Sequence, residues 1–348
     1  MHERDNWVDY AKGIGIILVV YGHVARGLFN SGISVPLNTY HLLDSIVYTF
    51  HMPLFFFLSG LFFYKSIVNK GCKKIIFSKI DTIFYPYIIW SLLQGGAEVF
   101  LSNYTNGDVP IEKVMSLLWS PRAQFWFLYA LFFTFIFAAI IYSTKMKNVT
   151  IPLFILSVIF YFYPVILPNI YIPRLVANYL AFFMLGVVFK MYFQIKHFSS
   201  LAAVLSLLLA FIISQWVFHD YLSLSFIDKG VALFILTCVS IAFVISISSY
   251  ISLKSKNCRS LAYIGASSMA IYLMHIFAGS GIRVLLGKFF NIHSFTFHIT
   301  TGCIFGVLLT LLALYLVEKM KIKYIFSAPI SHFTEKLHKR IFERNRRY

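Results

Sequence analysis

Ten stretches of about 20 mostly apolar residues follow one another along this chain and limit the folds that it can adopt. A helix needs about 20 such residues to cross the hydrocarbon core of a bilayer. The chain is 59% hydrophobic and 12% charged, and a soluble domain of 348 residues could not bury that much apolar surface. The sequence therefore predicts an all-α polytopic membrane helix bundle, with helices at about residues 10–28, 44–64, 80–101, 123–143, 149–167, 175–194, 200–218, 230–253, 261–286 and 297–320.

The distribution of lysine and arginine predicts the orientation of this bundle. Cytoplasmic loops of membrane proteins carry an excess of both residues. With the N-terminus inside, 23 of the 30 basic residues lie on the inner side and 7 on the outer side. The first outer loop, residues 30–43, has none. Both termini are therefore expected in the cytoplasm.

The basic composition does not by itself indicate a nucleic-acid partner. The net charge is +17, but the basic residues lie in short runs between apolar stretches, without any nucleic-acid-binding motif. The four cysteines have no paired spacing, so we predict neither a disulfide framework nor a metal site. Acidic residues dilute the N-terminal positive charge and no small-residue cleavage site follows, so the first helix is expected to be retained.

The transmembrane domain is predicted to occupy residues 1–321, followed by a basic cytoplasmic tail at 322–348. Four apolar residues of the tail fall at helical spacing among lysines and arginines: Ile330, Phe333, Leu337 and Ile341. This pattern favours an amphipathic helix on an anionic inner leaflet. A disordered basic tail fits the composition equally well.

The first apolar stretch carries charged and titratable residues at its two ends. Lys12 and His23 are 11 residues apart, which is about three helical turns, so they share a face about 16 Å apart along the axis. Asp9 lies one turn before Lys12 and can pair with it. Such groups are costly against lipid, so we expect them to point into the bundle or a cavity. The alternative is a lysine that reaches the interface and a histidine that bonds a neighbouring helix.

Other apolar stretches also contain polar groups. Pro53 can bend the second helix, and the small residues Ser59 and Gly60 let another backbone approach closely. Trp126 is typical of an interfacial anchor, and a tryptophan can also stack on a sugar. Together with the first helix, these groups favour a polar tunnel whose candidate lining is His51, Ser59, Glu98, Trp126, Tyr272 and His275.

Five motifs in order carry a resemblance to a known family. Asp-x-x-Lys (9–12) is separated from His23 by ten residues, and then come HMPLFFFLSG (51–60), WFL (126–128), FFMLG (182–186) and SMAIYLMH (268–275). Over residues 7–320 the chain resembles the acyltransferase-3 family of integral membrane enzymes, which O-acetylate cell-surface polysaccharides. The segment WVDYAKGIGIILVVYGH (7–23), which ends at His23, looks closest to the branch containing fucose 4-O-acetylases.

The chain departs from the family pattern at two places. The family's basic residue before the histidine is usually arginine, whereas this chain has Lys12, which keeps the charge but loses bidentate phosphate binding. An R-x-x-R stretch before a proline is replaced by KKIIFSKIDTIFYPY (73–87). Its basic residues Lys73, Lys74 and Lys79 end a basic loop at 65–79 that could attract the phosphates of coenzyme A. Positive-inside sorting explains that loop equally well.

The resemblance implies an O-acetyltransferase of the bacterial cytoplasmic membrane. Its donor would be cytoplasmic acyl-CoA, in particular acetyl-CoA, and its acceptor a hydroxyl of a polysaccharide or lipid-linked sugar at the outer face. A sugar hydroxyl needs a base near neutral pH, and His23 is the candidate, either as base or as a transient acyl carrier. Lys12 would hold an anionic part of the donor or polarise its thioester, and Asp9 would orient Lys12.

A non-enzymatic interpretation uses the same residues. In an exporter of polysaccharide or lipid-linked sugar, the intramembrane charges would form a proton relay. The absence of a visible internal repeat weighs slightly against it. A scaffold for a synthase complex would give no reason for Lys12 and His23 to share a face.

Overall fold

The computed structural model describes residues 6–102, 110–143, 148–168, 170–254, 258–332 and 334. In this part of the chain the secondary structure is helical throughout, without a strand. Nine of its helical segments are long and apolar enough to cross a membrane. The predicted all-α polytopic membrane bundle is confirmed.

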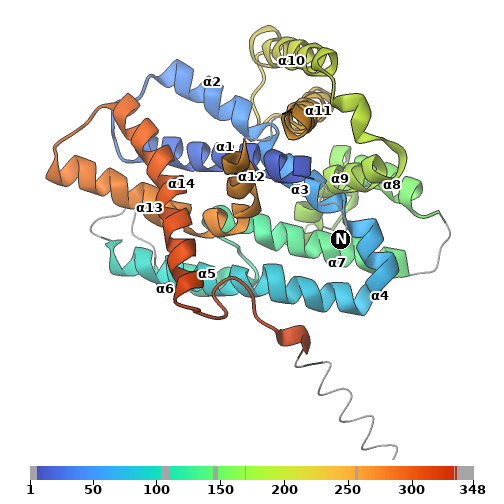
Figure 1. Cartoon of the computed structure of the whole chain (residues 1–348), viewed down its shortest axis with the longest axis horizontal. Helices are drawn as coiled ribbons and strands as arrows, with labels where there is room; N and C mark the ends of the chain where they lie inside the picture. The colour runs from blue at the N-terminus through green and yellow to red at the C-terminus, as the bar shows by residue number, and fades with distance from the viewer. Residues whose placement is uncertain are drawn as a thin grey trace, which may run out of the picture. The chain divides into compact units, whose positions relative to one another are not determined.

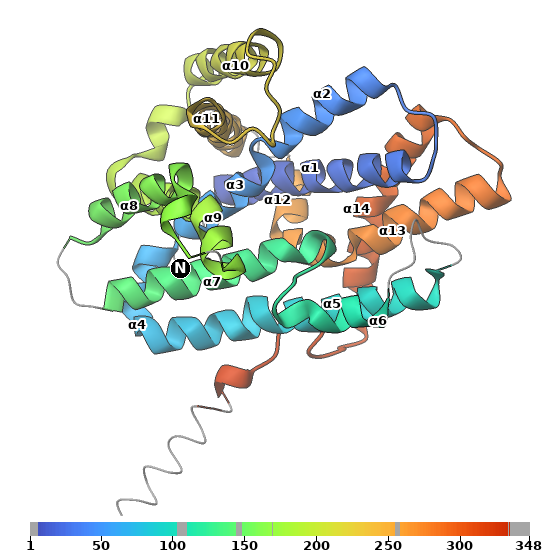
Figure 2. The ribbon, with the colours of Figure 1, turned by 180° about the vertical axis from the view of Figure 1, so that it is seen from behind.

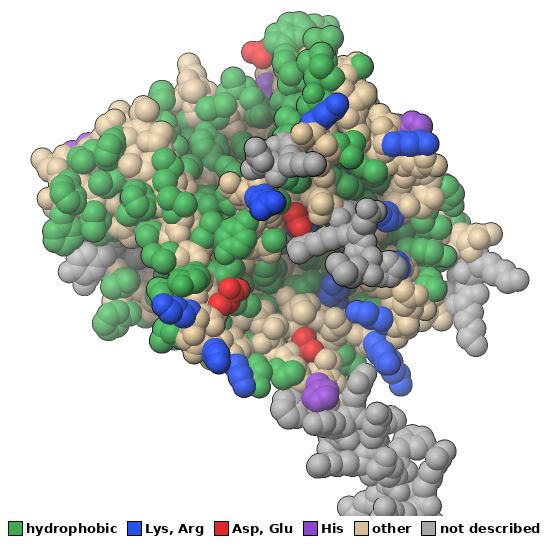
Figure 3. All heavy atoms as spheres, in the orientation of Figure 1, with side chains coloured by type: hydrophobic (Ala, Val, Ile, Leu, Met, Phe, Trp, Pro, Cys, Tyr) green, Lys and Arg blue, Asp and Glu red, His purple; other side chains and the backbone are tan. Residues whose placement is uncertain are grey.

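Large apolar side chains face outward along several of these helices. Leu209 of α10 (Leu201–Trp216) is 60% exposed and Leu308 of α14 (Phe295–Lys319) is 55% exposed. Hydrophobic side chains also lie over much of the face seen in Figure 3. Apolar surface of this extent marks a site that meets another apolar phase, which here is the lipid.

Two compact units make up the fold. The first comprises residues 1–59, 102–107 and 188–320, and the second comprises residues 60–101, 108–187 and 321–348. The first unit contains α1 (Asn6–Asn30), α2 (Leu37–Tyr48), nearly all of α3 (His51–Gly60), η6 (Ile195–Phe198), α10, η7 (Val217–Tyr221), α11 (Val231–Lys254), α12 (Arg259–Ala266), α13 (Ser268–Phe289) and α14. The second contains α4 (Phe63–Lys79), η1 (Ile80–Phe84), α5 (Tyr85–Phe100), α6 (Ile111–Met115), η3 (Ser116–Leu118), η4 (Ala123–Phe125), α7 (Trp126–Ser143), α8 (Thr150–Phe162), η5 (Pro164–Ile166) and most of α9 (Tyr171–Tyr192).

Helix α1 packs against five other helices of the first unit, namely α2, α11, α12, α13 and α14. It runs between α2 and α13 in both views of the ribbon (Figures 1 and 2). Glycines make the close approach possible: a Cβ on Gly13 would lie 2.5 Å from the carbonyl oxygen of Leu261, and one on Gly22 would lie 2.9 Å from the Tyr48 ring. The backbone of α1 is therefore held by direct contact with its neighbours.

The predicted second helix is divided in two. Helix α2 begins at Leu37, earlier than predicted, and the chain turns at Thr49 before α3 begins. Pro53 has no N–H to bond the carbonyl of Thr49, four residues earlier, which permits this bend. The hydroxyl of Thr237 in α11 lies 2.8 Å from that carbonyl oxygen and 2.7 Å from the carbonyl oxygen of Leu233, so its one hydrogen is shared between the two acceptors. The bend expected at Pro53 is confirmed, and a side chain from another helix satisfies the backbone that it frees.

Two further predicted helices differ from the structure. The segment predicted at 149–167 contains α8, whose 13 residues extend about 20 Å and fall short of a full crossing. It ends before Pro164, which starts a short 3₁₀ turn. The segment predicted at 261–286 breaks at Ser267 into α12 and α13. Ten predicted spans therefore become nine long helical segments and one short apolar helix among the described residues.

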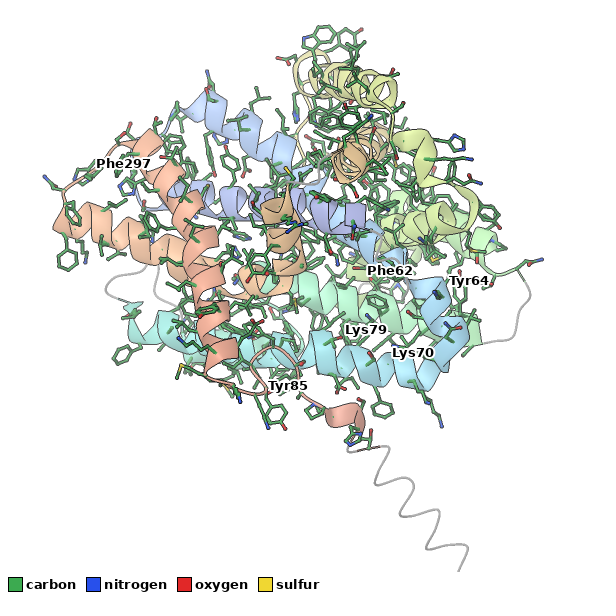
Figure 4. The ribbon with its side chains drawn as sticks, in the orientation of Figure 1. Phe62, Tyr64, Lys70, Lys79, Tyr85 and Phe297 are labelled. Carbon is green, nitrogen blue, oxygen red and sulfur yellow. The ribbon has the colours of Figure 1, made fainter. Side chains whose placement is uncertain are left out.

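The basic stretch at 65–79, predicted as a loop, is helical. This stretch forms most of α4. The buried residues of α4, Phe63, Ile67 and Ile75, recur at helical spacing. Gly71 interrupts the helix with a φ of +75°, a conformation that glycine adopts without strain. Figure 4 labels Lys70 just before this kink and Lys79 at the end of α4.

After α14 the chain is bound to helices of the second unit. The hydroxyl of Tyr85, labelled in Figure 4, donates to the carbonyl of Tyr324 at 2.8 Å, and the Trp90 ring nitrogen donates to the carbonyl of Ile325 at 3.0 Å. The Ser331 amide donates to Asp81 at 3.0 Å. Residues 330–332 are helical, but three of the four apolar positions of the predicted tail helix, 333, 337 and 341, lie outside the described residues, so this helix stays a prediction.

Candidate active site

Helix α1 presents Asp9, Lys12 and His23 from one continuous helix, as predicted. Lys12 Nζ lies 4.0 Å from Asp9 Oδ1, so the expected pair is formed. Asp9 is 8% exposed, and the Lys12 side chain is 35% exposed. The 11-residue separation puts Lys12 and His23 on one face of this helix.

His23 faces a second histidine. Its ring centroid lies 5.1 Å from that of His275 in α13, with an angle of 54° between the rings. His275 is 1% exposed, whereas His23 is only half-buried. The His23 side chain makes no hydrogen bond to any described residue. Its imidazole is therefore open to a ligand while one side is fixed by packing.

His51 belongs to the same region. It is 1% exposed, and its Nδ1 lies 2.7 Å from the carbonyl oxygen of Val47. The Tyr48 ring packs edge-on against it at 4.5 Å between centroids. The same Tyr48 ring lies against Gly22, the residue before His23, where a Cβ would lie 2.9 Å from it. Three histidines predicted separately from three apolar stretches thus gather in the first unit.

An ion pair that the sequence analysis missed lies one turn beyond His23. Arg26 donates to both carboxylate oxygens of Asp44 at 2.9 Å, and its guanidinium lies 3.4 Å from the centre of the Tyr48 ring. Arg26 is one of the seven basic residues that charge counting places on the outer side, and the spacing arguments give Asp44 no partner. An acid at the start of one apolar stretch and a cation at the end of another are the signals that could have paired them.

Two predicted lining residues of this unit have less distinctive surroundings. Tyr272 is 5% exposed, and its ring centroid lies 6.3 Å from that of His275. Ser59 is half-buried near the end of α3. Beside it, a Cβ on Gly60 would lie 3.2 Å from the amide nitrogen of Val187 and closer still to the Phe183 carbonyl. The close packing expected at Gly60 is confirmed.

The remaining candidates lie in the second unit. Glu98 accepts hydrogen bonds from Arg122 and from Gln94, the latter at 2.8 Å. The ring of Trp126 packs on that of Tyr179 with 5.2 Å between centroids. The structure thus places Glu98 in an ion pair within its own unit and Trp126 in an aromatic contact.

The three lysines suggested for donor binding differ in exposure. Lys73 and Lys74 are exposed on α4. Lys79 is half-buried, with Nζ 4.0 Å from the centre of the Phe135 ring in α7. In the part of the chain that the structure describes, no group of three or more histidine, cysteine or acidic residues could hold a metal ion.

Comparison with known families settles the relationship that the motifs suggested. The family model described as "Acyltransferase domain" matches residues 5–317. The chain belongs to the acyltransferase-3 family. The resemblance predicted from the five motifs is confirmed at this level. No solved structure matches the chain.

Two relatives from bacteria match part of this acyltransferase-3 protein. Nodulation protein NolL of Mesorhizobium japonicum is 29% identical over 140 residues, which is 39% of this chain and 35% of the relative. Nodulation protein NolL of Sinorhizobium fredii is 26% identical over 140 residues, which is 39% of this chain and 36% of the relative. The matched region spans just over a third of the length of these relatives.

All of the candidate site residues lie inside the acyltransferase-3 match. In the first unit, His275 packs on His23, and His51 and Arg26, the latter paired with Asp44, both contact the Tyr48 ring, whereas Asp9 and Lys12 lie about three turns away on α1. The polar tunnel predicted through the bundle, and the branch of the family, stay predictions.

Proposed function

We propose that this protein is a multi-pass membrane O-acyltransferase that moves an acetyl group from acetyl-CoA to a hydroxyl of a saccharide. Membership of the acyltransferase-3 family supports the reaction class. Nine long apolar helical segments among the described residues support its place in a membrane, and the bacterial sources of the relatives favour a bacterial cytoplasmic membrane.

The arrangement around His23 carries this proposal. A half-buried imidazole without a hydrogen bond to the described residues, packed on a buried second ring, suits a general base. The acceptor hydroxyl oxygen attacks the thioester carbonyl carbon, and its proton passes to His23. A C–O bond forms, the C–S bond breaks, and the leaving coenzyme A thiolate takes up the proton. The products are a saccharide ester and free coenzyme A.

Lys12 and Asp9 act at the other end of α1. With the N-terminus inside, Lys12 lies towards the cytoplasm, where it holds an anionic part of the donor. Its 35% exposed side chain and its pairing with Asp9 support this role. Lys73 and Lys74, exposed on α4, attract the phosphates of coenzyme A, and half-buried Lys79 adds positive charge near them.

The acceptor is a polysaccharide or lipid-linked sugar at the outer side of the membrane. His51, Ser59, Tyr272 and His275 border its path in the first unit. Glu98 and Trp126 belong to the second unit and are candidates for acceptor contacts there. The sequence of the segment that ends at His23 resembles the fucose 4-O-acetylase branch, which favours an acceptor of the kind that this branch uses.

The experiment that tests the function uses the full chain purified in detergent. It is incubated with acetyl-CoA labelled in the acetyl group and with a panel of soluble sugars that includes fucose. We expect label in an ester of one of the sugars and release of one coenzyme A for each ester formed. The contrary result is that the protein binds the saccharide, forms no ester and moves the saccharide across the membrane of proteoliposomes. That result would contradict the enzymatic activity and support an exporter.

A further inference from the structure

His275 is buried in α13, and its two ring nitrogens differ in their surroundings. Its Nδ1 lies 3.0 Å from the carbonyl oxygen of Ile271 and 2.9 Å from that of Tyr272. A carbonyl oxygen only accepts hydrogen bonds, so Nδ1 must carry the ring hydrogen. In a neutral imidazole the other nitrogen, Nε2, then presents a lone pair.

The Nε2 atom of His275 is buried and has no hydrogen-bond partner in the described part of the chain. The residue as a whole is 1% exposed. Buried polar atoms are almost always hydrogen-bonded, and an exception calls for a reason. A backbone-anchored ring with an unfilled acceptor is prepared to receive a donor from a neighbour or from a ligand.

The ring of His23 is the adjacent group that can supply this donor. The two centroids are 5.1 Å apart. When two imidazoles at this separation turn nitrogen towards nitrogen, the facing nitrogens come within hydrogen-bond distance. His23 is half-buried and makes no hydrogen bond to a described residue that would oppose such a rotation.

We propose that His275 is a positioning residue whose Nε2 accepts a hydrogen bond from one ring nitrogen of His23. This inference rests on the proposed function, because it assigns the orientation of the base used there. With one His23 nitrogen donating to His275, the other carries the lone pair and faces the acceptor hydroxyl. When the acceptor proton moves to that nitrogen, His23 becomes a cation and its bond to His275 strengthens.

Another buried histidine of the first unit provides a control for burial alone. His298 in α14 is 2% exposed, and its Nε2 lies 2.8 Å from the carbonyl oxygen of Ile292. Its Nδ1 is likewise buried without a partner in the described residues. His298 therefore matches His275 in burial and in bonding, while the ring contact with His23 belongs to His275.

Three substitutions of His275 separate positioning from packing. His275→Gln puts an amide oxygen near the position of Nε2 and keeps an acceptor for His23. His275→Asn places its amide near Nδ1 and leaves His23 without an acceptor. His275→Phe keeps a flat ring and has neither nitrogen. His298→Phe is the matched control.

Initial rates of acetyl transfer are measured for each purified variant, with acetyl-CoA and the sugar each varied. We expect His275→Asn and His275→Phe to lower kcat on the order of 10²-fold with little change in either KM, as for loss of an oriented base. His275→Gln should retain at least ten times the kcat of the phenylalanine variant. His298→Phe should keep the kcat of the unmodified protein.

Two results would overturn the positioning role. One is an unchanged kcat in His275→Phe. The other is an equal loss in the glutamine and phenylalanine variants while both elute as monodisperse protein and unfold at the temperature of the unmodified chain. Comparison with His23→Ala separates the two hypotheses. Full activity in that variant rejects the proposed base itself, whereas an inactive His23→Ala beside a fully active His275→Phe rejects only the positioning.

Discussion

Replacement of Gly265 by alanine tests the packing that holds the first turn of α1 in place. A methyl group at this position would lie 2.7 Å from the backbone nitrogen of Gly13 and closer still to the carbonyl oxygen of Asp9. Ordinary van der Waals contact begins near 3.4 Å, so α12 and α1 would have to separate by at least about 0.7 Å. Both obstacles are backbone, so no side chain can rotate to relieve them.

The magnitude follows from two opposing terms. Overpacking of a well-packed site costs about 1–3 kcal/mol, and a clash against backbone belongs at the upper end. Alanine is intrinsically better than glycine in a helix by about 1 kcal/mol, which offsets part of that cost. We therefore expect Gly265→Ala to destabilise the protein by about 2 kcal/mol.

Gly281→Ala in α13 is the matched control, because a Cβ there meets no atom within 4 Å. It should stabilise the protein by up to about 1 kcal/mol. Thermal unfolding of both variants in the same detergent, followed by tryptophan fluorescence, gives the comparison. The unfolding temperature should fall for Gly265→Ala and stay equal or rise for Gly281→Ala. Equal unfolding temperatures for the two variants would refute the packing argument.

Two further substitutions test interactions that the structure places in the first unit. Asp44→Asn should lower the free energy of unfolding by on the order of 1–3 kcal/mol, because it leaves the partly exposed Arg26 without its carboxylate. A double variant that also replaces Arg26 by Met should recover part of this loss. The absence of any recovery would contradict the pairing. Thr237→Val should cost about 1–3 kcal/mol, since the carbonyl of Thr49 loses its donor beside Pro53. Thermal unfolding measures both effects, and an unchanged unfolding temperature for Thr237→Val would show that the hydroxyl is dispensable.

Much of the architecture could be predicted from hydrophobic patterning, because a membrane span needs a long apolar segment. Helix α1 and its Asp9–Lys12 pair follow from spacing alone. The short α8 and the break at Ser267 could not be predicted in this way. Both depend on where a helix stops inside an apolar stretch, which Pro164 and the packing of α12 on α1 decide.

The candidate site could be predicted only in part from the sequence. Spacing identifies residues that share a face of one helix, but it does not say which helices meet. The contact of His23 with His275 and the pair of Arg26 with Asp44 each join two helices, so they required the fold. Arg26 was counted with the outer loop because charge counting treats helix ends as loops.

The role of His23 as the base is tested by comparing His23→Ala with a substitution of an exposed histidine in η6, His197→Ala. Both variants are purified in the same detergent, shown to be monodisperse, and assayed for transfer of labelled acetyl groups from acetyl-CoA to the sugar that the unmodified protein uses. We expect kcat to fall by about 10²- to 10⁴-fold in His23→Ala, as for loss of a general base, and to be unchanged in His197→Ala. Transfer by His23→Ala at the rate of the unmodified protein would contradict this role.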